Sequence, residues 1–167
     1  MVYTMVNLVI MRHGEAEPLS SQDSQRQLTA KGRVEVSQMA AWLAQHYQTV
    51  DWVLCSPYIR TRQTAELMLA QQGPATQFEI LPELTPEGDC HQVQLYINAR
   101  LEQSPDARFL LVSHMPLVSF LVETFTKNGC APVFETSGLV CIDYRPPAAG
   151  KLLERMAPSD LKLITAS

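Results

Sequence analysis

The stretch Asn7-Leu8-Val9-Ile10-Met11-Arg12-His13-Gly14-Glu15 passes from apolar to charged residues in one step. A short apolar run of this kind is typical of a strand buried on both faces, as in parallel sheets. Polar residues that directly follow such a strand lie at the carboxyl edge of the sheet, where α/β proteins place their binding groups. We therefore predict a strand over residues 7–11 and a functional site at Arg12 and His13.

The rest of the chain alternates between short apolar runs and segments with helical spacing, which predicts an α/β fold. Further strands are expected at 52–55, 78–81 and 109–112, with a C-terminal hairpin formed by 138–144 and 151–156. Helices are expected after the N-cap Thr29, from Pro57 in a first turn to about residue 70, and over 91–103 and 117–125. The segment 82–88 is expected to be a loop.

The composition narrows the class of protein. The 167 residues carry a net charge of −4 and are 46% hydrophobic, so we expect one folded domain spanning residues 1–167. The acidic balance and the lack of a Lys/Arg run argue against a nucleic-acid partner. No stretch approaches the roughly 20 apolar residues of a membrane span, so no membrane association is expected. Nothing indicates an assembly, and we favour a monomer.

The N-terminus and the cysteines bear on the cellular location. We find no signal-peptide pattern, and either Met1 or Met5 could be the natural start. Four scattered cysteines form no C-x-x-C pair and no cluster with zinc-ligand spacing. They are Cys55, Cys90, Cys130 and Cys141. We interpret them as reduced thiols in a cytoplasmic protein.

Three polar motifs follow predicted strands directly: Arg12-His13-Gly14, Ser56-Pro57-x-x-Arg60 and Ser113-His114. Together with Leu28-Thr29-x-x-Gly32 and Pro82-Glu83-Leu84, in this order and over nearly the whole chain, they resemble the histidine phosphatase superfamily, which includes the phosphoglycerate mutases. The segments 81–89, 112–118 and 156–162 are similar to the bacterial phosphohistidine phosphatases of the SixA family. This resemblance implies a three-layer α/β/α sandwich with a central, mostly parallel sheet and no large lid insertion.

The chemistry of phosphoryl transfer agrees with the residues in these motifs. A phosphoryl group needs its negative charge neutralised and an in-line attack held in place. Arg12 and Arg60 are our candidate clamps, because a guanidinium binds two phosphate oxygens at once. His114 is expected to serve as a third donor if it is protonated, a form that the neighbouring phosphate favours. The resemblance implies that His13 is the nucleophile and forms a phosphohistidine intermediate, which water then hydrolyses.

A proton donor and acceptor is also expected. The resemblance assigns it to Glu83, but Glu87 and Asp89 share the same segment and remain alternatives. No cofactor or metal is required, since arginines and a histidine supply the positive charge.

Other polar residues near these motifs have more ordinary interpretations. Thr64 either orients Arg60 or bonds the preceding helical turn, with equal weight, and Ser113 is interpreted as a structural turn residue. Arg62, His46 and His91 are interpreted as surface or capping residues. The polar segment 18–27 is either solvated or forms a rim that meets the substrate.

The short chain also bears on the substrate. About two dozen residues separate Glu83 from the next strand, and they read as one helix, so we expect an open site. An open site suits a phosphorylated histidine on a protein surface, and the resemblance implies a phosphotransfer domain or phosphocarrier protein in a bacterial signalling relay. Two alternatives remain: a small-molecule phosphomonoesterase on the same fold, and a non-catalytic module that binds phosphohistidine.

Overall fold

The computed structural model describes residues 5–19, 22–127 and 130–165, with side chains described up to residue 162. Met1, one of the two candidate start residues, lies outside the described residues. The strands are Leu8–Arg12 (β1), Trp52–Cys55 (β2), Gln77–Ile80 (β3), Phe109–Ser113 (β4), Leu139–Asp143 (β5) and Lys151–Met156 (β6). The helices are Ala30–His46 (α1), Ile59–Leu69 (α2), Cys90–Gln103 (α3), Leu117–Phe125 (α4) and Pro158–Thr165 (α5), with short 3₁₀ turns at Asp23–Gln25 (η1) and Pro82–Leu84 (η2).

The strands form one six-stranded sheet in the order β3-β2-β4-β1-β5-β6. Strands β3, β2, β4 and β1 are parallel, and β5 and β6 join them as an antiparallel hairpin beside β1. The central strands β1 and β4 are buried almost throughout, which explains why their sequences are continuous apolar runs rather than alternating ones. The mostly parallel sheet predicted from the sequence is confirmed.

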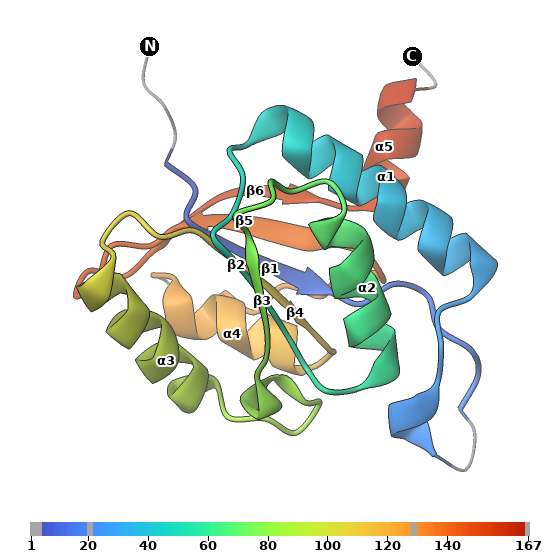
Figure 1. Cartoon of the computed structure of the whole chain (residues 1–167), viewed down its shortest axis with the longest axis horizontal. Coiled ribbons are helices and arrows are strands. Elements are labelled where there is room, and N and C mark those ends of the chain that lie inside the picture. Colours follow the sequence, from blue (N-terminus) through green and yellow to red (C-terminus); the bar gives the residue numbers. More distant parts are fainter. Residues whose placement is uncertain (1–4, 20–21, 128–129, 166–167) are drawn as a thin grey trace.

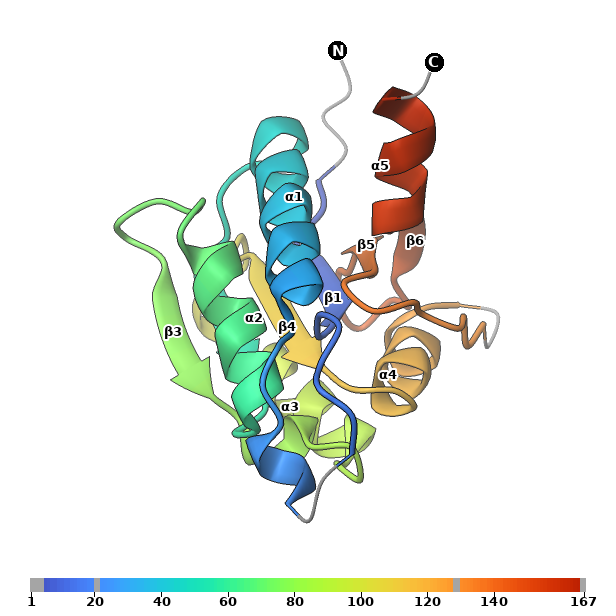
Figure 2. The same cartoon turned by 90° about the vertical axis from the view of Figure 1, so that its right-hand side faces the viewer.

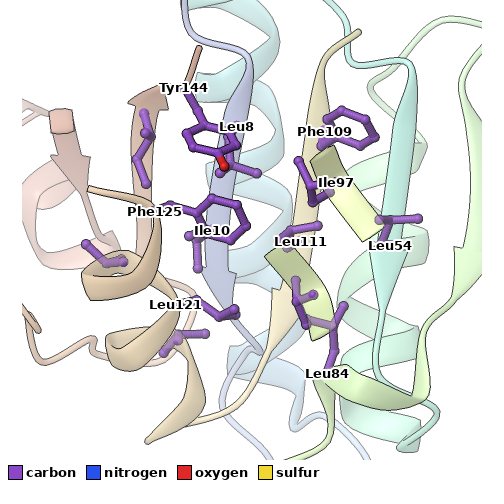
Figure 3. Close-up of a cluster of buried hydrophobic side chains, with 14 of the residues drawn as sticks. Leu8, Ile10, Leu54, Leu84, Ile97, Phe109, Leu111, Leu121, Phe125 and Tyr144 are labelled. Carbon is purple, nitrogen blue, oxygen red and sulfur yellow. The ribbon is translucent and has the colours of Figure 1, made fainter. Parts of the chain in front are cut away.

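Helices cover both faces of this sheet, with α1 and α2 on one face and α3 and α4 on the other (Figure 1). Successive side chains of a strand point to opposite faces, so each strand supplies two cores. Leu8 and Ile10 pack beneath α3 and α4, in the cluster drawn in Figure 3, whereas Val9 and Met11 pack beneath α1 and α2. The three-layer sandwich expected from the resemblance is therefore confirmed.

Local sequence accounts for most helix boundaries. The hydroxyl of Thr29 accepts a hydrogen bond from the Gly32 N–H at 2.9 Å and caps α1 as predicted. Helix α4 spans 117–125, as its apolar pattern predicts. The expectation for Pro57 is wrong: α2 begins at Ile59, because Tyr58 is still extended, with φ −66° and ψ 145°.

Two other elements differ from the sequence-based expectation. The segment 82–88, expected to be a loop, contains the η2 turn, whose first residue is Pro82. Helix α5 was not predicted, since eight residues give too short a window for helical periodicity. Within the described ranges, no helix has both the length and the apolar character needed to cross a bilayer.

Candidate active site

The three polar motifs meet at one edge of the sheet. Strands β2, β4 and β1 are neighbours, and their register pairs Cys55 with Val112 and Arg12 with Ser113. Because the strands are parallel, the residues that follow them emerge together, beside His13 and His114. Figure 2 shows the arrowheads of β1 and β4 ending at this edge, with the segment that carries η1 beyond them. The sheet thus joins residues up to 101 positions apart in sequence.

His13 is held in one tautomer. Its Nδ1 lies 2.7 Å from the carbonyl oxygen of Gly14, which can only accept, so Nδ1 carries the proton and donates it. The other ring nitrogen, Nε2, accepts a hydrogen bond from Nε of Arg60 at 3.3 Å. The lone pair on Nε2 therefore faces a guanidinium, a cation that can also bind an anionic group at this position.

The surroundings also keep His13 uncharged. Burial lowers its pKa from 6.5 to about 4, and the Arg60 and Arg12 charges act in the same direction, while the bond to Gly14 opposes them. The side chain is only 6% exposed. At neutral pH the ring is therefore neutral, and its Nε2 carries no proton but accepts the hydrogen bond from Arg60.

Arg60 lies in the first turn of α2 and is buried against the site. Its terminal nitrogens donate to Asp23, NH1 to the carbonyl oxygen at 2.7 Å and NH2 to Oδ2 at 3.2 Å. The guanidinium also lies 5.0 Å from the centre of the Tyr58 ring. Three separate contacts therefore fix this arginine beside His13.

Arg12, the residue before His13, contacts a different segment from Arg60. Its NH1 donates to the carbonyl oxygen of Phe134 at 2.7 Å, while its buried Nε has no hydrogen-bond partner among the described residues. The next residue in the chain, His13, accepts at its carbonyl oxygen from the Ser137 N–H at 3.0 Å. The segment 134–137 is therefore a wall of the site that the motifs did not reveal.

His114 lies next to His13, with the ring centroids 5.3 Å apart. Its Nε2 is 2.8 Å from the hydroxyl oxygen of Ser56, and its buried Nδ1 has no partner in the part of the chain that the structure describes. Burial, followed by the charges of His13 and Arg60, lowers the pKa of His114 to about 2. The ring is therefore neutral in the phosphate-free protein, and the protonated donor expected beside a bound phosphate stays a prediction.

The turn after His13 needs glycine because other chain segments approach it closely. A Cβ on Gly14 would lie 2.6 Å from Cγ2 of Val36, and one on Gly32 would lie 2.2 Å from the carbonyl oxygen of Glu15. The Gly14 N–H donates to the Thr64 hydroxyl at 3.0 Å, and that hydroxyl donates to the Arg60 carbonyl oxygen at 2.7 Å. Thr64 thus bonds the preceding turn and also joins α2 to the His13 turn.

Glu83 lies in η2, half-buried, in a segment fastened to the same edge of the sheet. The Ser113 hydroxyl donates to the carbonyl oxygen of Leu84 at 2.7 Å, and the Leu81 N–H donates to that of Cys55 at 2.8 Å. Ser113 therefore has the structural role expected from the sequence. The Glu83 backbone lies within two residues of both anchors, next to the strand that ends before His114.

The other two candidate acids differ from Glu83 in their surroundings. Asp89 is the N-cap of α3 and accepts from the N–H groups of His91 and Gln92. Glu87 is exposed to solvent. Of the surface interpretations, Arg62 and His91 are exposed, and His46 bonds the carbonyl oxygen of Trp42 within α1.

Sequence reasoning missed two charged residues of the site, Asp23 and Arg26. Asp23 accepts from Arg60 and, at 2.9 Å, from Nε of Arg26. Both arginines lie close enough to lower the pKa of His13. The available signal was the i, i+3 spacing of an acid and a base in a polar segment, which the sequence left open as either solvated or a rim of the site.

Comparisons with known proteins agree with this arrangement. Residues 8–87 match the family model described as histidine phosphatase superfamily (branch 1). The phosphohistidine phosphatase SixA of Escherichia coli strain K12 is 35% identical over 161 residues, which cover 96% of this chain and 99% of that protein.

Solved structures give the same result. A structure of the protein histidine phosphatase SixA complexed with tungstate matches with a TM-score of 0.87 and 35% identity, covering 92% of this chain and 98% of that one. A putative α-ribazole-5′-P phosphatase from Escherichia coli matches at 21% identity with a TM-score of 0.67, covering 87% and 93%, and so shares the fold. From its motifs, its fold and its relatives, this chain belongs to the histidine phosphatase superfamily.

Proposed function

We propose that this protein is a phosphohistidine phosphatase that removes phosphate from a histidine of another protein through a phosphohistidine formed on His13. The observation that carries the proposal is the contact between Nε of Arg60 and Nε2 of His13, which joins a fixed cation to a neutral nucleophile. The SixA relative, at 35% identity over nearly the whole chain, supports the same activity.

Unpartnered donors around His13 support an anion as the missing partner. Among the described residues, the buried side-chain nitrogens or oxygens without a hydrogen-bond partner belong to Arg12, His114 and Ser137. Arg12 adjoins His13 in the chain, the ring of His114 lies near that of His13, and Ser137 bonds its backbone. Buried polar groups rarely remain unpaired, so a ligand with several acceptor oxygens fits this place.

The serine beside His114 bears on which nitrogen of that ring can donate. The Ser56 oxygen accepts from the Tyr58 N–H at 3.2 Å and lies 2.8 Å from Nε2 of His114, and we infer that its own proton is donated to Nε2. A neutral ring then carries its proton on Nδ1, the nitrogen without a partner. We therefore assign Nδ1–H of His114 as a phosphate donor, with Arg12 and Arg60 as the cationic clamps.

The reaction proceeds in two displacements. The Nε2 lone pair of His13 attacks phosphorus, the phosphorus–nitrogen bond of the substrate breaks, and its electron pair leaves with the substrate imidazole, which takes up a proton. Water then attacks the phosphoryl group on His13, and the bond from phosphorus to Nε2 breaks to release inorganic phosphate. Glu83 is our candidate to supply and accept these protons. This scheme requires no metal or cofactor.

The form of the substrate follows from what surrounds the site. Between Glu83 and β4 the chain forms α3 and its flanking turns rather than a separate lid. Leu19 and Val133, which are 76% and 75% exposed, lie in the segments that contact Arg60 and Arg12. A site without a separate lid and with exposed apolar side chains in two adjoining segments suits a protein surface better than a small ester. We propose a histidine phosphotransfer domain or phosphocarrier protein in a signalling relay as the substrate.

The cellular location is proposed on separate grounds. All four cysteines are free thiols, and the thiols of Cys55 and Cys141 are buried. Burial raises the pKa of each of these two to about 12, so both are inert thiols rather than redox groups. We propose the cytoplasm, where thiols stay reduced and phosphorelay proteins act.

A competition assay tests the function. Radiolabelled phosphotransfer domains and common phosphate esters are offered at equal concentration, and release of inorganic phosphate is measured for wild type, His13→Ala and His91→Ala. We expect the phosphoprotein to be preferred, His13→Ala to be inactive and to lack an acid-labile label, and the exposed His91 control to match wild type. Preference for a phosphate ester would identify a small-molecule phosphatase, and binding without turnover would identify a non-catalytic module.

A further inference from the structure

Arg60 uses different parts of its guanidinium for two different residues. Nε donates to His13, whereas NH1 and NH2 both donate to Asp23, one to its backbone carbonyl and one to its carboxylate. A guanidinium is planar, so fixing both terminal nitrogens also fixes the direction of the Nε–H bond. Asp23 therefore determines where the third donor of Arg60 points.

Arg60 keeps enough donors for a phosphoryl group. The guanidinium has five N–H bonds, and three of them are used in these contacts. The two that remain belong to the terminal nitrogens, and Nε–H becomes available when a phosphoryl group occupies Nε2 of His13. Asp23 and a phosphoryl group can thus be bound at the same time.

Asp23 itself is held by its own segment. Arg26 donates from Nε to the Asp23 carboxylate at 2.9 Å and from NH1 to the carbonyl oxygen of Glu17 at 2.8 Å. Glu17 and Gln27 are joined twice, through Glu17 N–H to the Gln27 carbonyl at 2.8 Å and through Gln27 N–H to the Glu17 carboxylate at 2.9 Å. Glu17 and Gln27, which flank the segment that carries η1, are therefore joined to each other by hydrogen bonds.

The carboxyl group of Asp23 is ionised at neutral pH. Partial burial acts to raise the pKa of its carboxyl group, but the positive charges of Arg60 and Arg26 outweigh it and lower the pKa below 3.8. Arg60 therefore faces an ionised carboxylate at neutral pH.

We propose that Asp23 is a positioning residue for phosphoryl transfer, which holds both terminal nitrogens of Arg60 so that Nε–H faces the attacking nitrogen of His13. The inference rests on the proposed phosphatase function, because it assigns Asp23 a role in that reaction. Asp23 touches neither the nucleophile nor the phosphoryl group in this scheme, and it acts only through Arg60.

A double-mutant cycle tests this dependence. Asp23→Ala, Arg60→Ala and the double variant are compared for kcat/KM on a phosphohistidine substrate and for the dissociation constant of tungstate measured by calorimetry. Asp143→Asn is the matched control, because Asp143 also pairs with an arginine, Arg145, but lies at the end of β5.

We expect Asp23→Ala to lower kcat/KM and tungstate affinity about tenfold, as losing a charge-assisted hydrogen bond does. In the Arg60→Ala background the same change should have no further effect on kcat/KM or tungstate affinity. The melting temperature of Asp23→Ala itself should stay close to that of wild type. Asp143→Asn should leave both functional measurements unchanged.

Two outcomes would overturn the proposal. Losses that multiply in the double variant would show that Asp23 acts independently of Arg60. Tighter tungstate binding by Asp23→Ala would show that the carboxylate competes with the anion instead of positioning its ligand. Tungstate binding needs no turnover, so a wild type that binds tungstate but hydrolyses no phosphohistidine refutes the proposed function while the cycle still tests Asp23.

Discussion

Nε of Arg60 lies 3.3 Å from Nε2 of His13, so the guanidinium donates directly to the nitrogen that we assign as the nucleophile. A lysine keeps the charge but lacks the planar fork, and cannot hold Asp23, His13 and a phosphate together. Arg60→Lys should lower kcat/KM by about a hundredfold, the usual effect of removing one preorganised donor. Arg62→Lys, an exposed arginine on the same helix, is the control. If Arg60→Lys keeps a kcat/KM near that of wild type, Arg60 is not the phosphate-binding residue that we propose.

The pH dependence of activity should reflect the lowered pKa of His13. Because burial lowers this pKa from 6.5 to about 4, the acidic limb of kcat/KM should lie near pH 4, where the ring takes up a proton and loses its lone pair. His114 lies close enough to titrate together with it. Measured pH–rate profiles and imidazole ¹⁵N shifts check this, and a limb at pH 6 to 7 would contradict it.

The same shifts predict how stability changes with pH. In the unfolded chain both histidines take up protons near pH 6.5, whereas in the folded protein His13 does so near 4 and His114 near 2. The unfolded state therefore binds more protons, and the free energy of unfolding should fall as pH drops below 6.5. For His13 this loss is complete near pH 4. Urea titrations of wild type and His114→Gln test it, since the variant should lose less stability on acidification.

Thr64 offers a test of how the His13 turn is held. Thr64→Val removes the acceptor of the buried Gly14 N–H and should cost about 1–3 kcal/mol of unfolding free energy. Thr126→Val is matched, because Thr126 is also buried and bonds the carbonyl four residues earlier. We expect Thr64→Val to lose activity as well, and equal effects at both sites would contradict a specific link to the His13 turn.

The proton donor can be identified by comparing three neighbouring acids. Imidazole leaves a phosphoryl group more readily than an alkoxide does, so Glu83→Gln should reduce hydrolysis of an alkyl phosphate much more than that of phosphohistidine. Exposed Glu87→Gln should have no effect on either. Asp89→Asn should keep the α3 cap, because asparagine caps a helix as well as aspartate does, and should not change this ratio. If the Glu87 or Asp89 variant instead loses hydrolysis of the alkyl phosphate more than that of phosphohistidine, that residue is the proton donor.

Continuous apolar runs and N-caps allowed most of the fold to be predicted. Strands β1, β2 and β4 are buried on both faces, so their sequences stand out from the polar segments around them. The start of α2 was less predictable, because proline restricts φ without requiring that its neighbours be helical. Helix α5 is too short to show a period.

The candidate site was predictable where a residue directly follows a strand, as His13 and His114 do. Asp23 escaped prediction because its role depends on a segment that folds back across the edge of the sheet to reach Arg60, 37 residues later in the chain. Ser137 escaped for a similar reason: its positive φ of 66° and its bond to His13 belong to a turn without periodic sequence.

The hydrogen-bonded register of β2, β4 and β1 has a consequence for how such an enzyme diversifies. Strand pairing sets the positions of His13, our proposed nucleophile, and His114, because Arg12 pairs with Ser113. Leu19 and Val133 lie in connecting segments outside that pairing. Loop length and composition can drift without disturbing strand pairing. Lineages, or a directed-evolution library confined to those connections, can therefore exchange one phosphoprotein substrate for another while inheriting the same chemistry.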